Sequence, residues 1–337
     1  MKYTLYKEFP DHMKKDWDAL VSRSVSDVPF LLYEFMKSWW QTRGGGEWPQ
    51  AELAIITAME EDTLVGIAPM FYVPEHQGKR CLFLLGTIEV YDYLDLIVEA
   101  KDLSAFVDGL LTFIDSDALP EWDILDFSNL LDDSLSLQVL QQIAEQRSLS
   151  YQEEVLQPSP YIPLPGDWDA YLAGIKKKQR HEIRRKMRRM ENSEVESNWY
   201  VVKDKADLET EMDEFLDMMM QDRDKEAFMT AEMRDHMQLT ARSAFDAGIL
   251  HLSFLVVDGK RAAGKFMFAY NDVLWAYNSC VNFSMTEYSP GWVLLGYLLE
   301  WANQNGFKEF DFMRGDEQYK YRFGAVDRFV KRFRIER

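Results

Sequence analysis

Residues 251–281 read HLSFLVVDGKRAAGKFMFAYNDVLWAYNSCV, and this stretch decides the fold of its half of the chain. Apolar runs rich in β-branched and aromatic residues are separated by Asp258-Gly259 and Asn271-Asp272, and Asp-Gly is a strong signal for a tight hairpin turn. The expected strands are residues 251–257, 262–270 and 273–281. The stretch therefore predicts a three-stranded antiparallel meander.

The segments on both sides of the meander complete an α+β unit. Upstream, the spacing of apolar residues predicts a strand at 198–202 and helices at 206–221 and 231–247. Downstream, Ser289 is the expected N-cap of a helix that has Pro290 in its first turn and ends at Asn305-Gly306. An apolar strand that ends at Phe312 follows this helix.

The first half of the chain has a similar order of elements. Helices are expected at residues 14–24, 30–41, 103–114 and 135–145, and strands at 51–58, 64–73, 80–85, 94–98 and 122–127. Residues 124–127 (ILDF) and 309–312 (EFDF) each come after a meander and a helix, which suggests an internal duplication. The connection, residues 157–166, contains four of the eleven prolines and cannot form a helix or a central strand. We therefore predict domains at residues 1–156 and 167–337.

Composition narrows the class of protein. The chain has 337 residues, of which 47% are hydrophobic, so it can bury a sizeable core. No apolar run approaches the length of a membrane span, and the N-terminus has no apolar stretch typical of a signal peptide. Cys81 and Cys280 lie in strand-like contexts, so we expect buried thiols and a cytoplasmic location. The five histidines are scattered, and no metal site is expected.

One basic segment opposes the net charge of -19, which would otherwise repel polyanions. Residues 176–189 contain nine Lys and Arg against the single Glu182. With apolar residues at steps of three and four from Trp168 onward and Asp167 as a cap, the pattern predicts one amphipathic helix with a cationic ridge. The ridge is either a docking surface for phosphates or an anionic polymer, or a solvated face that pairs with the acidic body.

A second charged cluster follows the last apolar strand of the meander unit. Residues 310–324 read FDFMRGDEQYKYRFG, and Gly315 allows the backbone to turn sharply. The carboxylates Asp316 and Glu317, two tyrosines, a lysine and two arginines lie within a few residues of Gly315 and suit the binding of a polar substrate. A salt-bridged surface loop is the alternative.

Several of these segments together resemble a known family. Residues 168–172 (WDAYL) with the basic helix, 277–279 (YNS), 289–295 (SPGWVLL) and 310–324 are similar to the GNAT-like acetyltransferase domain of the CelD/BcsL type of cellulose biosynthesis, which is related to the Fem peptidyltransferases. The resemblance is strongest over residues 160–326, and residues 91–95 (YDYLD) resemble an acidic aromatic motif of the family. It implies an α+β fold of tandem GNAT-like domains, each with a mixed, mostly antiparallel sheet flanked by helices.

The resemblance implies acyl transfer to an amine or hydroxyl of a sugar, a polysaccharide precursor or another polar acceptor. The candidate catalytic residues are Asp316, Tyr277, Lys265 and Tyr319. The candidates for binding the acceptor are Tyr93, Asp95, Arg314 and Glu317. The candidates for binding the donor and its phosphates are Ser289, Gly291, Lys320, Arg322, Arg180 and Arg184. Lys265 is flanked by core residues of a strand, which is unfavourable unless the amine is paired or reaches solvent.

The acyl donor remains open at this stage. Acetyl-CoA or another acyl-CoA is expected first, but the turn before the helix reads Glu287-Tyr288-Ser289-Pro290-Gly291 and has one glycine where GNAT enzymes usually have several. Pro290 also removes an amide donor. A Fem-like use of aminoacyl-tRNA, with the basic ridge as its contact, is the first alternative. A non-catalytic binding protein with the same fold is the second.

Overall fold

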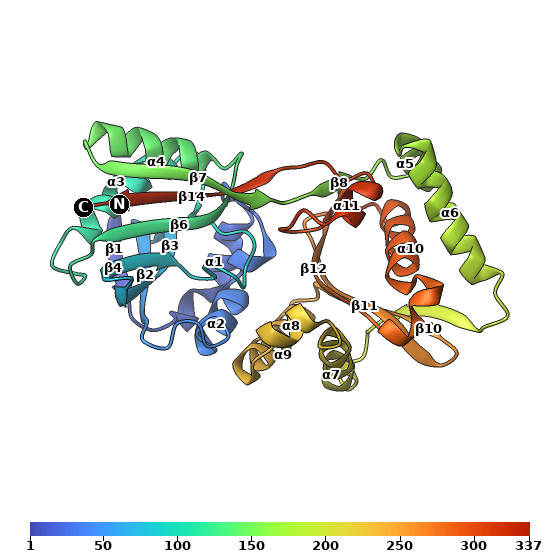
Figure 1. Cartoon of the computed structure of the whole chain (residues 1–337). Helices are drawn as coiled ribbons and strands as arrows, with labels where there is room; N and C mark the ends of the chain where they lie inside the picture. Colours follow the sequence, from blue (N-terminus) through green and yellow to red (C-terminus); the bar gives the residue numbers. More distant parts are fainter. The chain divides into compact units, whose positions relative to one another are not determined.

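The computed structural model describes residues 1–337, and the chain divides into two compact units (Figure 1). The first unit comprises Met1–Gln157 and Phe329–Arg337, and the second comprises Pro158–Arg328. Each unit has its own sheet with helices against it, so the predicted class, tandem α+β domains, is confirmed.

The first unit contains an eight-stranded sheet in the order β1-β2-β3-β4-β6-β14-β7, with β5 paired to β3. Its strands are β1 (Lys2–Tyr6), β2 (Glu52–Glu60), β3 (Thr63–His76), β4 (Lys79–Leu84), β5 (Ile97–Val98), β6 (Ile124–Leu131), β7 (Ser150–Pro158) and β14 (Phe329–Glu336). Its helices are η1 (Asp11–Met13), α1 (Lys14–Val21), η2 (Pro29–Leu31), α2 (Tyr33–Gln41), α3 (Leu103–Ile114) and α4 (Leu135–Gln146).

The second unit contains a six-stranded sheet in the order β8-β13-β12-β11-β10-β9. Its strands are β8 (Tyr161–Pro163), β9 (Ser197–Val201), β10 (Leu250–Val257), β11 (Lys260–Tyr270), β12 (Val273–Val281) and β13 (Glu309–Asp311). Its helices are α5 (Trp168–Gly174), α6 (Lys177–Glu191), α7 (Leu208–Met219), α8 (Arg223–Phe228), α9 (Ala231–Asp246), η3 (Phe283–Tyr288), α10 (Pro290–Gln304) and α11 (Gln318–Arg322). None of the helices in either unit combines the length and the hydrophobicity that a membrane span requires.

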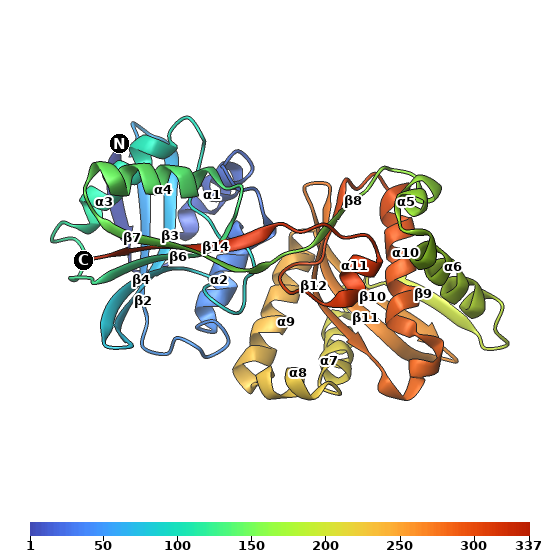
Figure 2. The ribbon, with the colours of Figure 1, turned by 45° about the horizontal axis from the view of Figure 1, so that its top comes forward.

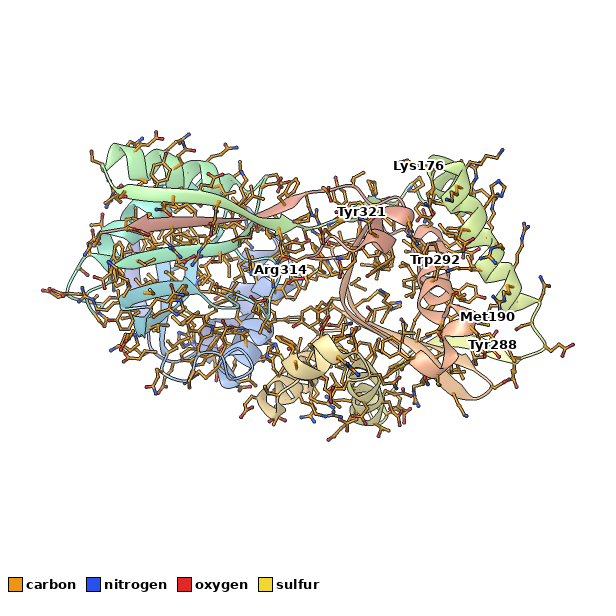
Figure 3. The ribbon with its side chains drawn as sticks, viewed as in Figure 1. Lys176, Met190, Tyr288, Trp292, Arg314 and Tyr321 are labelled. Carbon is orange, nitrogen blue, oxygen red and sulfur yellow. The ribbon has the colours of Figure 1, made fainter.

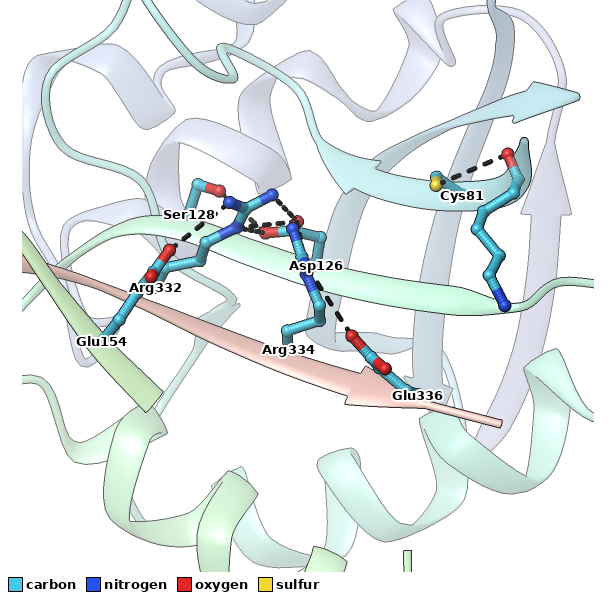
Figure 4. Close-up of polar contacts among 8 residues, drawn as sticks. Cys81, Asp126, Ser128, Glu154, Arg332, Arg334 and Glu336 are labelled. Carbon is cyan, nitrogen blue, oxygen red and sulfur yellow. Dashed lines mark hydrogen bonds and ion pairs between the residues drawn. The ribbon is translucent and has the colours of Figure 1, made fainter. Parts of the chain in front are cut away.

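The last strand of the chain lies in the first unit, whereas the sequence analysis assigned residues 329–337 to the second half. β14 pairs antiparallel with β6, from Val330 opposite Leu131 to Glu336 opposite Ile124. Val330, Phe333 and Ile335 are fully buried, and their burial in this core explains the placement. Arg332 and Arg334 of β14 also hold the buried carboxylate of Asp126 on β6 (Figure 4).

The meander of the second unit forms as predicted. Asp258 and Gly259 have φ angles of 47° and 70°, and Asn271 and Asp272 have 52° and 57°, so both turns place two residues in the left-handed region that tight hairpins need. β11 and β12 shift register between Phe266 and Phe268, because Phe266 pairs with Asn278 but Phe268 pairs with Trp275. β12 therefore carries one extra residue at this point, which is a β-bulge.

Beyond the bulge, β12 and β13 separate. The two strands are parallel neighbours only from Val273 opposite Glu309 to Trp275 opposite Asp311. β12 continues to Val281, whereas the chain after Asp311 turns away through Met313 and Gly315, which have φ angles of 61° and 108°. α10 packs against one face of this sheet, and α7 packs against the other (Figure 2).

The predicted basic helix is two helices. Ile175 and Lys176 have ψ angles of 146° and 133°, which are extended values, and they separate α5 from α6. Ile175 is buried next to Gly324, so its packing into the core breaks the helix. The Asp167 cap is confirmed, because its carboxylate accepts a hydrogen bond from the Ala170 amide at 2.7 Å. α6 packs on α10 (Figure 3), and Gly296 of α10 leaves room for the Met187 side chain.

Candidate functional site

A cavity of about 220 Å³ lies in the second unit where β12 leaves β13. It is closed by strand ends on one side and by the starts of two helices on the other. Its lining residues are Gly264 and Lys265 of β11, Ser279, Cys280 and Val281 of β12, Gly291, Trp292, Leu294 and Leu295 of α10, Tyr319 of α11, and Phe323. Most of the lining is apolar, and it contains no carboxylate.

Lys265 is the charged group of this cavity. β11 pairs Lys265 with Ser279 of β12, and both residues line the cavity. The Lys265 side chain is buried, with 5% of its surface exposed, and it makes neither a hydrogen bond nor an ion pair. Its ammonium lies 5.7 Å from the centre of the Tyr319 ring. Burial, together with the nearby charges of Lys225 and Lys320, lowers the pKa of Lys265 to about 7.

The other polar groups of the cavity can all donate hydrogen bonds. The Trp292 indole nitrogen is buried without a partner. Burial raises the pKa of Tyr319, so its hydroxyl stays protonated. Burial also raises the pKa of Cys280 to about 12, which keeps it a thiol as the sequence predicted. Lys225 of α8 binds the edge of β12, because its ammonium donates to the Ser279 carbonyl oxygen at 2.6 Å.

Two glycines allow the walls of the cavity to come close together. A Cβ atom on Gly291 would lie 2.9 Å from Val281 Cγ2, and one on Gly264 would lie 2.8 Å from Cys280 Sγ. Both distances are shorter than the contacts that real Cβ atoms make, so glycine at position 291 lets the first turn of α10 approach β12 without displacing the Val281 side chain.

The loop after β13 is held by Lys320, which corrects the prediction that Lys320 binds phosphate. The Lys320 side chain is 2% exposed. Its ammonium donates to the carbonyl oxygens of Arg314 at 2.9 Å and Gly315 at 3.0 Å and pairs with Glu317 at 2.9 Å. All its hydrogens are used, so Lys320 stabilises the loop rather than a ligand.

The remaining residues of that loop lie outside the cavity. Asp316 and Arg322 are exposed, and Arg314 is half-buried. Partial burial acts to raise the pKa of Glu317, but the hydrogen bond and charge of Lys320 outweigh it and lower that pKa. Of residues 310–324, the structure therefore brings Tyr319 and Phe323 to the cavity together with Lys265, and none of the charged side chains.

Tyr277 and Ser289 also differ from their predicted roles. The Tyr277 ring packs against Phe266 and Phe268, with ring centres 5.4 Å apart in each case, and it does not line the cavity. The bulge in β12 explains this, because the extra residue changes the face to which side chains point. Ser289 precedes α10 as predicted, but its φ angle is 53° and its side chain accepts no capping bond.

Two predicted phosphate-binding arginines hold α5 instead. Arg180 donates to the carbonyl oxygens of Leu172 and Ala173 at the end of α5, and Arg184 pairs with Asp169 at 2.8 Å. The exposed cations without an ion pair on this segment are Lys176, Lys177, Lys178, Arg188 and Arg189. Lys186 lies 4.2 Å from the centre of the Trp292 ring, so α6 contributes a positive charge close to a wall of the cavity.

The predicted acceptor residues of the first half are in the core of the first unit. Tyr93 is 1% exposed and Asp95 is fully buried. The Asp95 carboxylate accepts hydrogen bonds from Ser26 at 2.5 Å and Ser134 at 2.6 Å, and burial raises its pKa. These contacts make Asp95 a structural residue of the first unit.

Ser279, Trp292 and Lys225 were not among the predicted site residues. Ser279 and Trp292 stood inside motifs that were noted for the resemblance, and alternation along β12 could have placed Ser279 beside Lys265. No sequence pattern pointed to Lys225, because it lies on α8, a short helix that was not predicted.

Comparison with known proteins agrees with this geometry. Residues 177–321, all in the second unit, match a family model described as the acetyltransferase (GNAT) domain. No curated protein sequence matches the chain significantly.

Solved structures resemble the chain over nearly its whole length. FemX aligns with 98% of this chain and 97% of its own, with a TM-score of 0.68 and 10% sequence identity. A conserved protein of unknown function from Bacteroides thetaiotaomicron aligns over 100% of both chains, with a TM-score of 0.64 and 14% identity. L-PGS from Bacillus licheniformis aligns over 90% of this chain and 91% of its own, with a TM-score of 0.54 and 11% identity.

At these identities, the similarities show the fold alone. They show that these proteins share the fold of the whole chain, and the match to the acetyltransferase (GNAT) domain lies within the second unit. The second unit therefore contains the region that matches the acetyltransferase (GNAT) domain, and this match supports an acyltransferase.

Proposed function

We propose that the second unit transfers an acyl group from an activated carrier to an amine or hydroxyl of a polar acceptor, and that the reaction takes place in the cavity between β12, α10 and α11. One observation carries the proposal. Where β12 leaves β13, the sheet opens into an apolar cavity that is lined by a partly buried tyrosine and a buried lysine, inside the part of the chain that matches the acetyltransferase domain.

The chemistry needs hydrogen-bond donors more than a reactive side chain. The acceptor's lone pair forms the new bond to the acyl carbon, and the carbonyl oxygen becomes negative. Collapse then breaks the bond to the carrier, and the proton lost by the acceptor's amine or hydroxyl ends on the expelled thiolate or alkoxide. Tyr319 and Ser279 are the donors that the cavity offers to this oxygen or to the leaving group. Burial raises the pKa of Tyr319, so its hydroxyl is protonated and can donate a hydrogen bond at neutral pH.

For the carrier, we propose an acyl-CoA first, with a sugar or polysaccharide precursor as the acceptor, on the basis of the CelD/BcsL resemblance. The start of α10 offers few free amides, because those of Trp292 and Val293 both donate to the Ser289 carbonyl oxygen and Pro290 has none. Lys186, which lies 4.2 Å from the centre of the Trp292 ring, is a candidate cation for the carrier's phosphates.

The exposed cations of α6 favour aminoacyl-tRNA as the second candidate carrier. Lys176, Lys177, Lys178, Arg188 and Arg189 have no acidic partner on an otherwise acidic chain, and a polyanion would supply one. The similarity of the whole chain to FemX is consistent with this alternative.

Melting temperatures of the full chain with acetyl-CoA and with total tRNA, each at low and high salt, separate the candidates. We expect acetyl-CoA at millimolar concentration to raise the melting temperature and to label an added acceptor. A rise with tRNA alone that disappears in salt would reverse the ranking. No rise with either would favour the non-catalytic binding protein. Replacing Lys177 and Lys178 with Gln should weaken only the tRNA effect, and Lys2 and Lys7 with Gln serve as the control.

A further inference from the structure

The cavity of the second unit contains a buried cation without an anion. Lys265 has 5% of its surface exposed, lines the cavity, and its ammonium forms no hydrogen bond or ion pair with another residue of the chain. A buried ammonium is strongly unfavourable unless a partner compensates its charge. The protein supplies none at this position, so the compensating group is expected on a ligand.

The surroundings of Lys265 add positive charge. Lys225 and Lys320 are the two charges that most disfavour a proton on Lys265. The acidic group that acts on it, Glu317, is half-exposed and is already paired with Lys320 at 2.9 Å. Three lysines therefore share one carboxylate, and the potential in this part of the cavity favours an anion.

The remaining polar groups suit an acceptor-rich ligand. Trp292 has a buried N–H without a partner, and the hydroxyls of Ser279 and Tyr319 can donate. The rest of the wall near them is apolar, with Val281 and Leu294 among its residues. A carboxylate on a short apolar body matches this combination, because its two oxygens accept several hydrogen bonds while the body contacts the apolar wall.

We infer that one of the two substrates of the proposed acyl transfer presents a carboxylate, which binds against Lys265. This inference rests on the proposed function in one respect, that the ligand is a substrate. The binding of a carboxylate at Lys265 is argued from the cavity alone. The carboxylate belongs either to the acceptor, as in an amino acid, or to the acyl group, as in a dicarboxylic acyl thioester. Lys265 thereby binds substrate rather than acting as the general base.

Titration calorimetry of the full chain with butyrate and with butyramide tests the binding step directly. At pH 6 we expect butyrate to bind at least about tenfold more tightly than the uncharged amide. Since only the protonated lysine attracts the carboxylate, and the pKa of Lys265 is about 7, the affinity should fall by about 30- to 100-fold between pH 6 and pH 9. Equal affinities for the acid and the amide would overturn the inference, as would a failure of butyrate to bind.

A matched pair of variants identifies the lysine responsible. Lys265→Met should remove the preference for butyrate, whereas Lys260→Met, at the exposed start of the same strand, should keep it. Lys265→Gln is a second replacement in case the methionine variant folds poorly, which its melting curve will show. A preference that survives both replacements at Lys265 would exclude this site.

Transfer assays with paired substrates then distinguish the source of the carboxylate. A rate with succinyl-CoA well above that with acetyl-CoA places it on the acyl group. A rate with 4-aminobutyrate well above that with butylamine places it on the acceptor. Butyrate binding without any transfer would contradict the proposed function and leave the anion site standing. Transfer without any preference for a carboxylate would contradict only this inference.

Discussion

The two units share one arrangement of a meander, a helix and a following strand, which we call the frame, but they differ in what lies next to it. In each unit a helix is followed by a strand that pairs in parallel with the last strand of a meander, and the third residue of that pairing is a buried aspartate. Asp126 lies opposite Phe83 in the first unit, and Asp311 lies opposite Trp275 in the second. Both side chains are fully buried and bound by arginine, Asp126 by Arg332 and Asp311 by Arg328.

The difference begins directly after these pairs. In the first unit, the chain after β4 fills the space itself, because Tyr91 and Tyr93 are buried there and the Asn129 amide donates to the carbonyl oxygens of Ile88 and Tyr91 at 2.8 Å. In the second unit, the same place holds the cavity. In the first unit, side chains of the chain itself fill the space beside the frame, whereas in the second unit that space is a cavity that can hold a ligand. We therefore expect catalysis in the second unit only.

The largest effect is expected when the shared frame is broken. Asp126→Ala leaves the guanidinium groups of Arg332 and Arg334 without their buried partner (Figure 4). The free energy of unfolding of the first unit should fall by about 3–5 kcal/mol. Urea denaturation followed by circular dichroism measures this loss, and Asp115→Ala, at a half-exposed ion pair with Arg337, is the control. A loss similar to that of the control would show that the carboxylate is not needed for the frame.

A somewhat smaller effect is expected from Lys265, and it should depend on pH. The pKa of Lys265 is lowered to about 7 in the folded chain, so between that value and its ordinary pKa the unfolded chain binds the extra proton. Stability should therefore rise as the pH increases from about 7 toward 10, by roughly 3–4 kcal/mol at most. Lys265→Met should remove most of this rise, whereas Lys260→Met should not. Parallel curves for wild type and Lys265→Met would show that the amine keeps its ordinary pKa.

Smaller and different effects on stability are expected from alanine at two glycines, Gly86 after β4 in the first unit and Gly291 at the cavity of the second unit. Gly86 of the first unit has a φ angle of 101°, and a Cβ atom there would lie 2.5 Å from Leu94 Cδ2, so Gly86→Ala should lower stability by about 1–3 kcal/mol. Gly291→Ala in the second unit should lower it by less than about 1 kcal/mol, because its backbone is helical and only Val281 must move. Instead, Gly291→Ala should weaken ligand binding in the cavity. Thermal melts with and without acetyl-CoA measure both effects, and equal losses of stability would contradict the distinction.

The smallest effect is expected at the surface of the second unit. Arg184→Ala removes an ion pair with Asp169 in which both partners are at least 39% exposed. It should reduce stability by at most about 1 kcal/mol, far less than the loss of the buried pair in the first unit. A reduction as large as that of Asp126→Ala would mean that Arg184 secures α5 more strongly than its exposure suggests.

The sequence predicted the elements well because their signals are local. The Asp258-Gly259 turn and the Asp167 cap each depend on a few neighbouring residues, and both formed as expected. The course of β14 and the break at Ile175 depend on partners more than a hundred residues away, such as Leu131 for Val330 and Gly324 for Ile175. Periodicity within a segment carries no information about such partners.

The candidate site was predicted in part for the same reason. Lys265 and Tyr319 were found because a lysine inside a strand and a tyrosine after a strand end are unusual in themselves. Lys320 was misassigned, since its partners are backbone carbonyl oxygens, which every sequence contains. Asp95 was misassigned because the serines that bind it lie 69 and 39 residues away.

The return of the chain to the first unit has a mechanical consequence. Both chain ends belong to that unit (Figure 1), and the second unit is inserted between residues 157 and 329. The strands that enter and leave it are adjacent, because the Ser159 amide donates to the Arg328 carbonyl oxygen at 2.7 Å. A pulling force applied to the two ends would act first on the first unit, and the two adjacent connecting strands would carry it past the second unit. The second unit would therefore bear no tension until the first unit had unfolded.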